Sequence, residues 1–499
     1  MRRSAVVLSV GLVLFLLAGC GQTTMTTPPV NSTSAVTLSI TDEPPSGVTV
    51  LFFQINLTAA SLTPASGTGT VSLLNNNTPL QVDVTELQAL SAFLSTASVQ
   101  AGTYSSLSLT FANPQLVIFN KSNQSIATTC AVGSVCQLTP QIENNSSTLS
   151  FTTAPFPLTV SQNSPLGLLL DFHLNNVIQS DLSVNLGVAN GVTVEPLPPA
   201  PPSGHRPFGF LQGTVQSVTA GQDQFTLLTR DGRMFTIDVN SSTTYGNFPT
   251  SACTTGGIAC LAQGQVVKVQ VAGVQGPATL LAAEVDFVQT AAQQTAEGNI
   301  IALSTSNGST VMKLLLHWSP NATSLPFGGI ANVTIASSAT FSVNAGMFTI
   351  PSGLSFASAT DLLVGQKVQV DVVAGSLTTT PNAPHWAPPS VSFTSDTIAL
   401  EPSQFTGMVS AVDSSASSFT IATFPNFFPL WSNANWMPDQ ITVQTTSQTT
   451  YQNLNPDSFS GVTVNTLVSV NGWLFNTPTA ATPSTIVGQT VLGRSNGFF

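Results

Sequence analysis

Charged side chains are the scarcest feature of this 499-residue chain. Only 6% of its residues are charged, with 10 Lys and Arg against 21 Asp and Glu, whereas about 25% is typical of soluble proteins. So few cations form no basic surface for a phosphate backbone, which argues against nucleic-acid binding. Hydrophobic residues make up 42% of the chain, so the low charge does not indicate a charge-driven disordered protein. A chain of this length suggests roughly three to five domains.

The sequence also lacks the short motifs that mark common catalytic and cofactor sites. It contains no H-E-x-x-H zinc motif, no G-x-S-x-G nucleophile elbow and no glycine-rich phosphate loop. Its histidines stand far apart, at positions 173, 205, 317 and 385. We therefore predict no enzyme activity, no cofactor and no metal. An active site assembled across several domains is the alternative.

A single long apolar run stands at the N-terminus. Arg2 and Arg3 precede a mostly apolar stretch from Ala5 to Ala18, which is typical of a secretory signal and short for a membrane span. The run ends in Leu-Ala-Gly followed by Cys20, and it resembles the lipobox of bacterial lipoproteins. That resemblance implies cleavage before Cys20, lipidation of its sulfur and anchoring in the cell envelope. An ordinary signal peptide, with Cys20 lost or incidental, is the alternative.

The same resemblance divides the start of the chain. Residues 1–19 would be the signal peptide, and the polar residues 20–34, which include two prolines, would form a flexible tether. The membrane would then be contacted through the N-terminal lipid. Gly21 stands where lipoproteins of some two-membrane bacteria carry an aspartate that retains them in the inner membrane. In such a host we expect a weak preference for the outer membrane.

Four further cysteines fall into two close pairs. Cys130 and Cys136 are six residues apart, and Cys253 and Cys260 are seven apart. In an oxidising envelope each pair would close a small disulfide loop. A zinc site made by all four cysteines, which the spacings do not favour, and pairing across the two regions are the alternatives.

Alternating apolar and polar residues predict strands over much of the first 195 residues, whereas the apolar spacing of Val82–Leu94 predicts a helix. Four segments carry a family resemblance: Leu38–Pro44, Asp83–Leu87, Ala101–Tyr104 and Leu170–Phe172. Together they resemble domain of unknown function 4382, an uncharacterised family of exported proteins. The resemblance implies a β-sandwich-like domain over residues 35–195 and brings no known activity.

Residues 196–207 contain six prolines and are predicted to be a semi-rigid linker. Three units follow, each with an opening glycine and a Ser-x-x-Thr-aromatic motif; two also carry a Gly-Gln strand. The units cover residues 208–290, 295–403 and 404–494 and resemble domain of unknown function 5666. The second and third depart from it by long insertions. We therefore predict an all-β chain, a β-sandwich-like domain followed by three small β-barrel or sandwich repeats.

Three tryptophans in proline-flanked insertions are the candidate ligand surface: Trp386, Trp431 and Trp436. Exposed, they could stack on sugar rings or contact a partner. Buried, they would fill barrel ends or contacts between domains, and burial is the more common outcome for this residue type.

Two acidic motifs on strands are predicted to be solvated. Asp171 and His173 alternate with apolar residues, and so do Glu284 and Asp286. Alternation places the apolar side chains in the core and the polar ones outside. A metal or a proton shared by Asp171 and His173 is the alternative for the first pair.

These features favour a lipid-anchored envelope protein with a non-catalytic binding, adhesion or scaffolding role, whose partner would be a glycan or an envelope protein. The alternative is an enzyme or accessory subunit of polysaccharide processing, which would need a cleft lined by acidic residues from different units. A third interpretation is a mechanical spacer that binds nothing.

Overall fold

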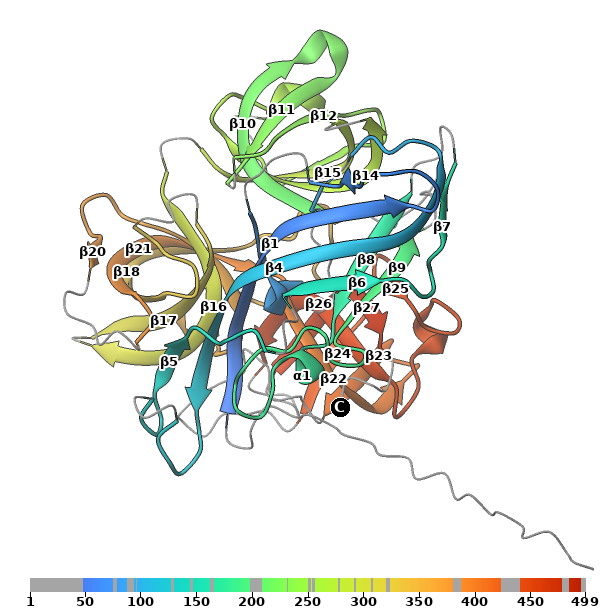
Figure 1. Cartoon of the computed structure of the whole chain (residues 1–499). Helices are drawn as coiled ribbons and strands as arrows, with labels where there is room; N and C mark the ends of the chain where they lie inside the picture. The colour runs from blue at the N-terminus through green and yellow to red at the C-terminus, as the bar shows by residue number, and fades with distance from the viewer. Residues whose placement is uncertain are drawn as a thin grey trace, which may run out of the picture. The chain divides into compact units, whose positions relative to one another are not determined.

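The computed structural model describes residues 48–494 apart from short gaps, namely 75–78, 88–93, 96, 127–129, 144–146, 162–165, 198–208, 231, 250–252, 254–255, 277–278, 291–292, 307, 320–323, 380–386, 423–439 and 478–483. Strands dominate it, in four sheets of six or seven strands and one two-stranded sheet (Figure 1). The predicted all-β class is therefore confirmed. Among these residues, no helix has the length and apolarity needed to cross a membrane.

The N-terminal module is built on two long antiparallel strands, β1 (Val48–Pro64) and β4 (Gly102–Asn120). Shorter strands pair with them: β2 (Val71–Ser72) and β3 (Leu80–Asp83) with β1, and β5 (Val135–Leu138), β6 (Thr148–Phe151) and β7 (Leu158–Val160) with β4. Alternate residues of β1 and β4, such as Leu62 and Leu107, face one core. The period-2 pattern of the sequence therefore predicts this sheet correctly.

A second layer covers that core. Strands β8 (Gly167–Phe172) and β9 (Val192–Leu197) form a two-stranded sheet. The short helix α1 (Leu174–Val177) lies between them in the sequence. The ring of Phe172 lies edge-on to Phe111 of β4, with centroids 5.6 Å apart. Two packed layers with apolar faces between them make the module sandwich-like, as predicted.

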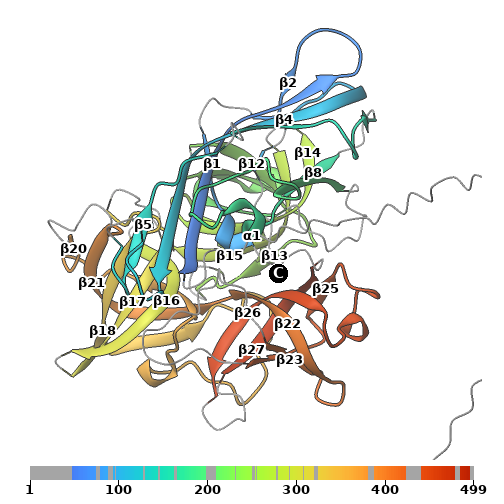
Figure 2. The same cartoon turned by 60° about the horizontal axis from the view of Figure 1, so that its bottom comes forward.

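Three six-stranded sheets follow, coloured green, yellow to orange, and orange to red in Figures 1 and 2. The first contains β10 (Phe210–Thr219), β11 (Gln224–Thr229), β12 (Met234–Asp238), β13 (Thr244–Gly246), β14 (Val266–Gly276) and β15 (Thr279–Gln289). The second contains β16 (Thr295–Ser306), β17 (Ser309–Trp318), β18 (Ile330–Val343), β19 (Lys367–Asp371), β20 (Thr378–Thr379) and β21 (Ser390–Glu401). The third contains β22 (Ser403–Asp413), β23 (Ser418–Ala422), β24 (Gln440–Gln444), β25 (Thr450–Gln452), β26 (Leu467–Asn476) and β27 (Ser484–Gly493).

Each of these sheets closes on itself through a parallel pairing. In the first, β12 pairs with β15, so that β12, β11, β10, β14 and β15 form a ring. The equivalent closing pairs are β18 with β21 and β24 with β27. Five strands in this order form a small Greek-key barrel, the architecture of oligonucleotide-binding folds. That likeness concerns architecture alone, because one fold hosts many functions.

Two motifs of the repeats now have a physical reason. A Cβ placed on Gly298, which opens the second unit, would lie within overlap distance of the Leu315 carbonyl on the neighbouring strand, so only glycine allows this close approach. In the Gly-Gln motif, Gly365 has a φ of 94°, which glycine adopts without strain. The adjacent Gln366 side chain accepts a hydrogen bond from the Leu363 N–H, 2.7 Å away.

Candidate functional site

A cluster of charged side chains begins at a short turn of the N-terminal module. Asp83 ends β3, and Thr85 donates to its Oδ1 atom from both the backbone N–H (3.1 Å) and the hydroxyl (2.5 Å). Aspartate favours such positions because its carboxylate accepts from N–H groups at the start of a turn. The 3-10 turn η1 (Val84–Leu87) then places Glu86 beside Asp83. The prediction of a helix over Val82–Leu94 was wrong for Val82–Leu87, which form the end of β3 and the turn η1. Residues 88–93 lie outside the described chain.

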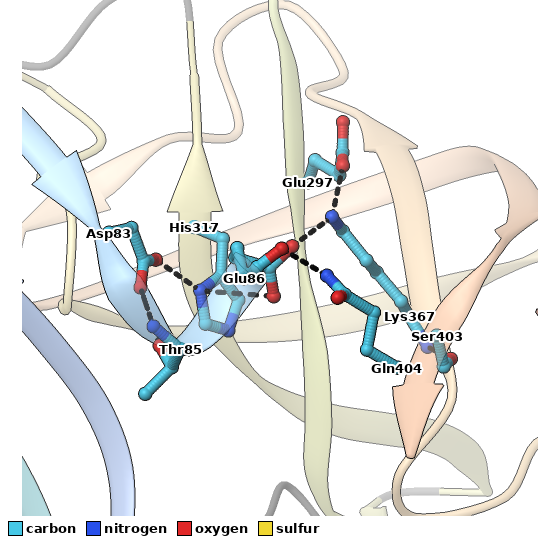
Figure 3. Close-up of polar contacts among 8 residues, drawn as sticks. All are labelled: Asp83, Thr85, Glu86, Glu297, His317, Lys367, Ser403 and Gln404. Atoms are coloured by element: carbon cyan, nitrogen blue, oxygen red, sulfur yellow. Dashed lines mark hydrogen bonds and ion pairs between the residues drawn. The ribbon is translucent and has the colours of Figure 1, made fainter. Parts of the chain in front are cut away.

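Three strands of the second barrel supply the partners, as Figure 3 shows. His317 on β17 places its Nδ1 atom 2.7 Å from Asp83 Oδ2 and 3.5 Å from Glu86 Oε1. Lys367 on β19 contacts Glu86 Oε2, and its Nζ atom lies 2.6 Å from Oε1 of Glu297 on β16. The five side chains alternate in sign and form one continuous row, which we call the junction network.

The third barrel joins the network through its first two residues. Gln404 donates a hydrogen bond from its side-chain amide to the Glu86 backbone carbonyl. The Ser403 hydroxyl accepts one from the Lys367 backbone N–H, at 2.8 Å. Glu86 therefore contacts residues of the second and third barrels, although it is more than 200 residues from either in sequence.

The network is buried. The side chains of His317, Glu297 and Lys367 are 2%, 7% and 11% exposed. Burial raises the pKa of Glu86, but the charges of His317 and Lys367 outweigh it and lower the pKa to about 2. Burial lowers the pKa of Lys367, but Glu297 and Glu86 reverse this and raise it above its ordinary value.

His317 follows the same logic. Burial lowers its pKa, whereas the carboxylates of Glu86 and Asp83 raise it, and the net result lies above the ordinary value. The two carboxylates therefore favour the protonated form of the imidazole. Removing one partner of such a buried pair leaves an unpaired charge, which costs about 3–5 kcal/mol.

The arrangement has limited chemical capacity. An Asp–His pair is the orienting half of an acid–base triad, but the other nitrogen of His317, Nε2, is buried with no hydrogen-bond partner among the described residues. The Phe52 ring lies beside the imidazole, with centroids 5.7 Å apart. In the described chain, therefore, no hydroxyl or thiol is in place for His317 to activate. Nor does that part of the chain hold three or more His, Cys, Asp or Glu side chains grouped around a metal position.

The two acidic motifs predicted to be solvated instead lie at contacts between modules, so that prediction was wrong. Arg494, just after β27, lies 3.4 Å from both carboxylate oxygens of Asp171, and the neighbouring His173 side chain is 12% exposed. Glu284 and Asp286 pack against Gly346 of the second barrel. Alternation identifies the side of a strand that faces its own core, but not whether another module covers the opposite side.

The predicted cysteine pairs are both present as disulfides. Cys130 bonds to Cys136, and Cys253 bonds to Cys260. Both are local loops, as expected, rather than a zinc site or a link between the two regions.

The other predicted site residues lie outside the described chain: Cys20, Trp386, Trp431 and Trp436. Trp473 is described, and it is 1% exposed in the core of the second and third barrels. Its indole N–H donates to the Asn344 carbonyl at 3.1 Å, and its ring packs on Phe348. For this tryptophan, burial between modules is what the structure shows.

Sequence reasoning did not identify the junction network. The usable signal was position: His317 follows Leu314, Leu315 and Leu316 on a strand that is buried on both faces. Lys367 opens a strand that continues in buried valines. A charged residue in such a strand must find a partner, because an unpaired charge is too costly to bury. The partner's identity could not be read from the sequence.

Family models match three segments of the chain. Residues 33–191 match "Domain of unknown function (DUF4382)", and residues 212–286 and 406–477 match "Domain of unknown function (DUF5666)". The chain thus carries a DUF4382 segment followed by two DUF5666 segments. The resemblances of the N-terminal module, and of the first and third units, are thereby confirmed, whereas no family model matches the second unit. No curated protein matches the chain.

The matches divide the junction network unevenly. The DUF4382 module contributes Asp83 and Glu86. Glu297, His317 and Lys367 belong to the second barrel, between the two DUF5666 segments and outside both. His317 and Lys367, the two basic residues of the network, thus come from the barrel that matches neither family model, and two of the three carboxylates come from the DUF4382 module.

Proposed function

We propose that this chain is a lipid-anchored protein of the cell envelope with a non-catalytic binding or scaffolding role. The observation that supports this role is the junction network. A chain with 6% charged residues places five ionisable side chains in one buried row, where they join the N-terminal module to the second barrel, and the uncharged Ser403 and Gln404 add the third barrel. Charges used in this way fix the relative position of modules rather than face a substrate. A body of fixed geometry carried on a tether is suited to presenting binding surfaces away from a membrane.

The anchoring part of the proposal rests on the lipobox and is tested at Cys20. The full chain and a Cys20→Ser variant would be expressed in a bacterial host with a labelled fatty acid. We expect the native chain to take up the label and sediment with membranes, and the variant to do neither. Label retained by the variant would overturn the assignment of Cys20.

The binding part is tested on the chain from Gly21, without its lipid. We would screen neutral and charged glycans and cell-wall fragments by isothermal titration. We expect saturable binding to at least one envelope polymer and its loss in the Trp431→Ala, Trp436→Ala double variant. Trp473→Phe is the matched control, because Trp473 is buried. Binding that survives in the double variant would exclude those tryptophans as the surface, and a flat screen would overturn a glycan partner.

One observation favours the enzyme alternative enough to test it. Burial and the charge of Glu297 raise the pKa of Glu401, at the end of β21, to about 8, while that of Glu86 is about 2. Carboxyl groups with pKa values pushed apart are typical of acid–base pairs in hydrolases. However, Glu86 is neutralised by Lys367 and His317, and Glu401 accepts a hydrogen bond from Asn344. Turnover of a polysaccharide that is abolished by Glu401→Gln in a folded variant would favour the enzyme.

A further inference from the structure

A pair of carboxyl groups lies where the first barrel meets the second. Glu284 and Asp286 stand two residues apart on β15, so their side chains emerge on the same side of the strand. A Cβ placed on Gly346 of the second barrel would lie 2.9 Å from Glu284 Oε1 and 3.2 Å from Asp286 Oδ1. Gly346 has a φ of 56°. The backbone of the second barrel therefore packs directly on both carboxyl groups.

Hydrogen bonds hold this contact on either side. The Met347 backbone N–H donates to Glu284. The Gly346 N–H donates to the Asn247 side chain of the first barrel, at 3.1 Å. Asp286 Oδ1 is buried and has no hydrogen-bond partner among the described residues. An ionised carboxylate oxygen without a partner is costly to bury, whereas a protonated one is much less so.

The charged groups around the pair give it little compensation. Lys268 on β14 is the cross-strand neighbour of Asp286, but its charge also acts on Glu86, Glu297 and Glu401. On β13, burial and the charge of Asp223 raise the pKa of Tyr245 to about 12, so it stays neutral. From the second barrel, the facing segment 344–350 contains no titratable side chain.

We propose that Glu284 and Asp286 make the contact between the first and second barrels dependent on pH. With one proton on the pair, the glycine backbone packs on a singly charged site and the contact is closed. With both groups ionised, two anions share one cation and the contact loosens.

The direction of the effect follows from the pKa of Asp286. Burial, and then the charge of Glu284, raise the pKa of Asp286 to about 7, and burial also raises that of Glu284. A carboxyl group whose pKa is raised in the closed state favours that state at low pH. The stabilisation of the closed contact by the protonated carboxyl group is lost as the pH rises from the ordinary pKa of an aspartate, 3.8, toward 7. The contact therefore closes in acid and opens near neutrality, independently of whether the chain is lipid-anchored.

Hydrogen exchange at single-amide resolution tests this on the chain from Gly21. Protection factors, corrected for the intrinsic rate, would be measured for Gly346 and Met347 between pH 5 and 8.5. We expect protection to fall by about tenfold or more across this range, because each pKa unit is worth a factor of ten. Thr349, whose N–H donates to Gln448 of the third barrel at 2.8 Å, is the internal reference.

Three variants decide the outcome. In Asp286→Asn and Glu284→Gln, protection of Gly346 and Met347 should no longer change with pH. Asp223→Asn, an exposed acid of the same barrel at a φ of 50° that asparagine also adopts, should behave as the native chain. If one acidic variant fails to fold, the other still tests the proposal. Protection that is independent of pH in the native chain, or that keeps its pH dependence in both acidic variants, would overturn it.

Discussion

Replacing Lys367 by methionine should destabilise the contact between the N-terminal module and the second barrel. The substitution keeps the length and apolar stem of the side chain but removes the cation that lies between Glu86 and Glu297. Two buried carboxylates then face each other without compensation. Breaking a buried ion pair costs about 3–5 kcal/mol.

The pKa of Glu86 indicates the same effect. It is lowered from 4.5 to about 2 although burial raises it, because the charges of His317 and Lys367 favour the ionised form, and a shift of this size corresponds to roughly 3 kcal/mol. His317 supplies part of that stabilisation, so Lys367 accounts for only a share of it through Glu86. The remainder of the expected loss comes from Glu297.

Scanning calorimetry at pH 7 is the appropriate assay, because a protein of several modules need not unfold in one step. We expect the transition that includes the second barrel to shift down by roughly 6–20 °C, at about 2–4 °C per kcal/mol. Lys313→Met, which removes an exposed lysine of the same barrel, should shift it by no more than about 2 °C. Adding Glu86→Gln and Glu297→Gln to Lys367→Met should recover much of the loss. Equal melting of the two lysine variants would refute the reasoning.

Three further predictions follow from single features. Because the folded-state pKa of Glu86 is depressed to about 2, the ionised carboxylate stabilises the fold above pH 4.5, and this stabilisation is lost as the pH falls toward 2. The native chain should therefore lose more stability in acid than Glu86→Gln. Identical profiles of stability against pH for the two proteins would contradict the pairing. Gly298→Ala should destabilise the second barrel by more than 2 kcal/mol, since its Cβ would overlap the Leu315 carbonyl; a melting temperature equal to that of the native chain would show that the strands can separate. Trp473→Phe should remove the fluorescence emission of a buried indole. It should also lower the melting temperature, because the hydrogen bond to the Asn344 carbonyl is lost. An unchanged melting temperature would indicate that packing alone holds this contact.

The sequence predicted the all-β class and two family resemblances correctly because their signals are local. Strand alternation, the Gly-Gln turn and the repeat-opening glycine each depend on residues a few positions apart, as Gly365 and Gln366 illustrate. The same kind of signal misled where it was short: Val82–Leu94 has helical spacing, but Leu80–Asp83 pairs with β1 and forms a strand. Pairing with a long neighbouring strand overrides a weak local preference.

The contacts between modules were beyond the reach of the sequence. Asp83 and His317 are 234 positions apart, and no pattern within either segment names the other. The error for Glu284 and Asp286 has the same origin, because their alternation describes β15 alone. Charged residues are so few in this chain that each buried one needs an identifiable partner of opposite charge. Which residue is the partner depends on how whole modules pack.

Closure of the three barrels has a consequence for aggregation. An open sheet exposes unpaired N–H and C=O groups at its edge strands, and proteins commonly protect such edges with lysine and other charged residues. This chain has ten Lys and Arg in all, too few for that strategy across four sheets. Joining β12 to β15, β18 to β21 and β24 to β27 leaves the barrels few edges on which a second molecule could add a strand. A charge-poor protein can thereby remain a separate molecule through its topology, where others rely on electrostatic repulsion.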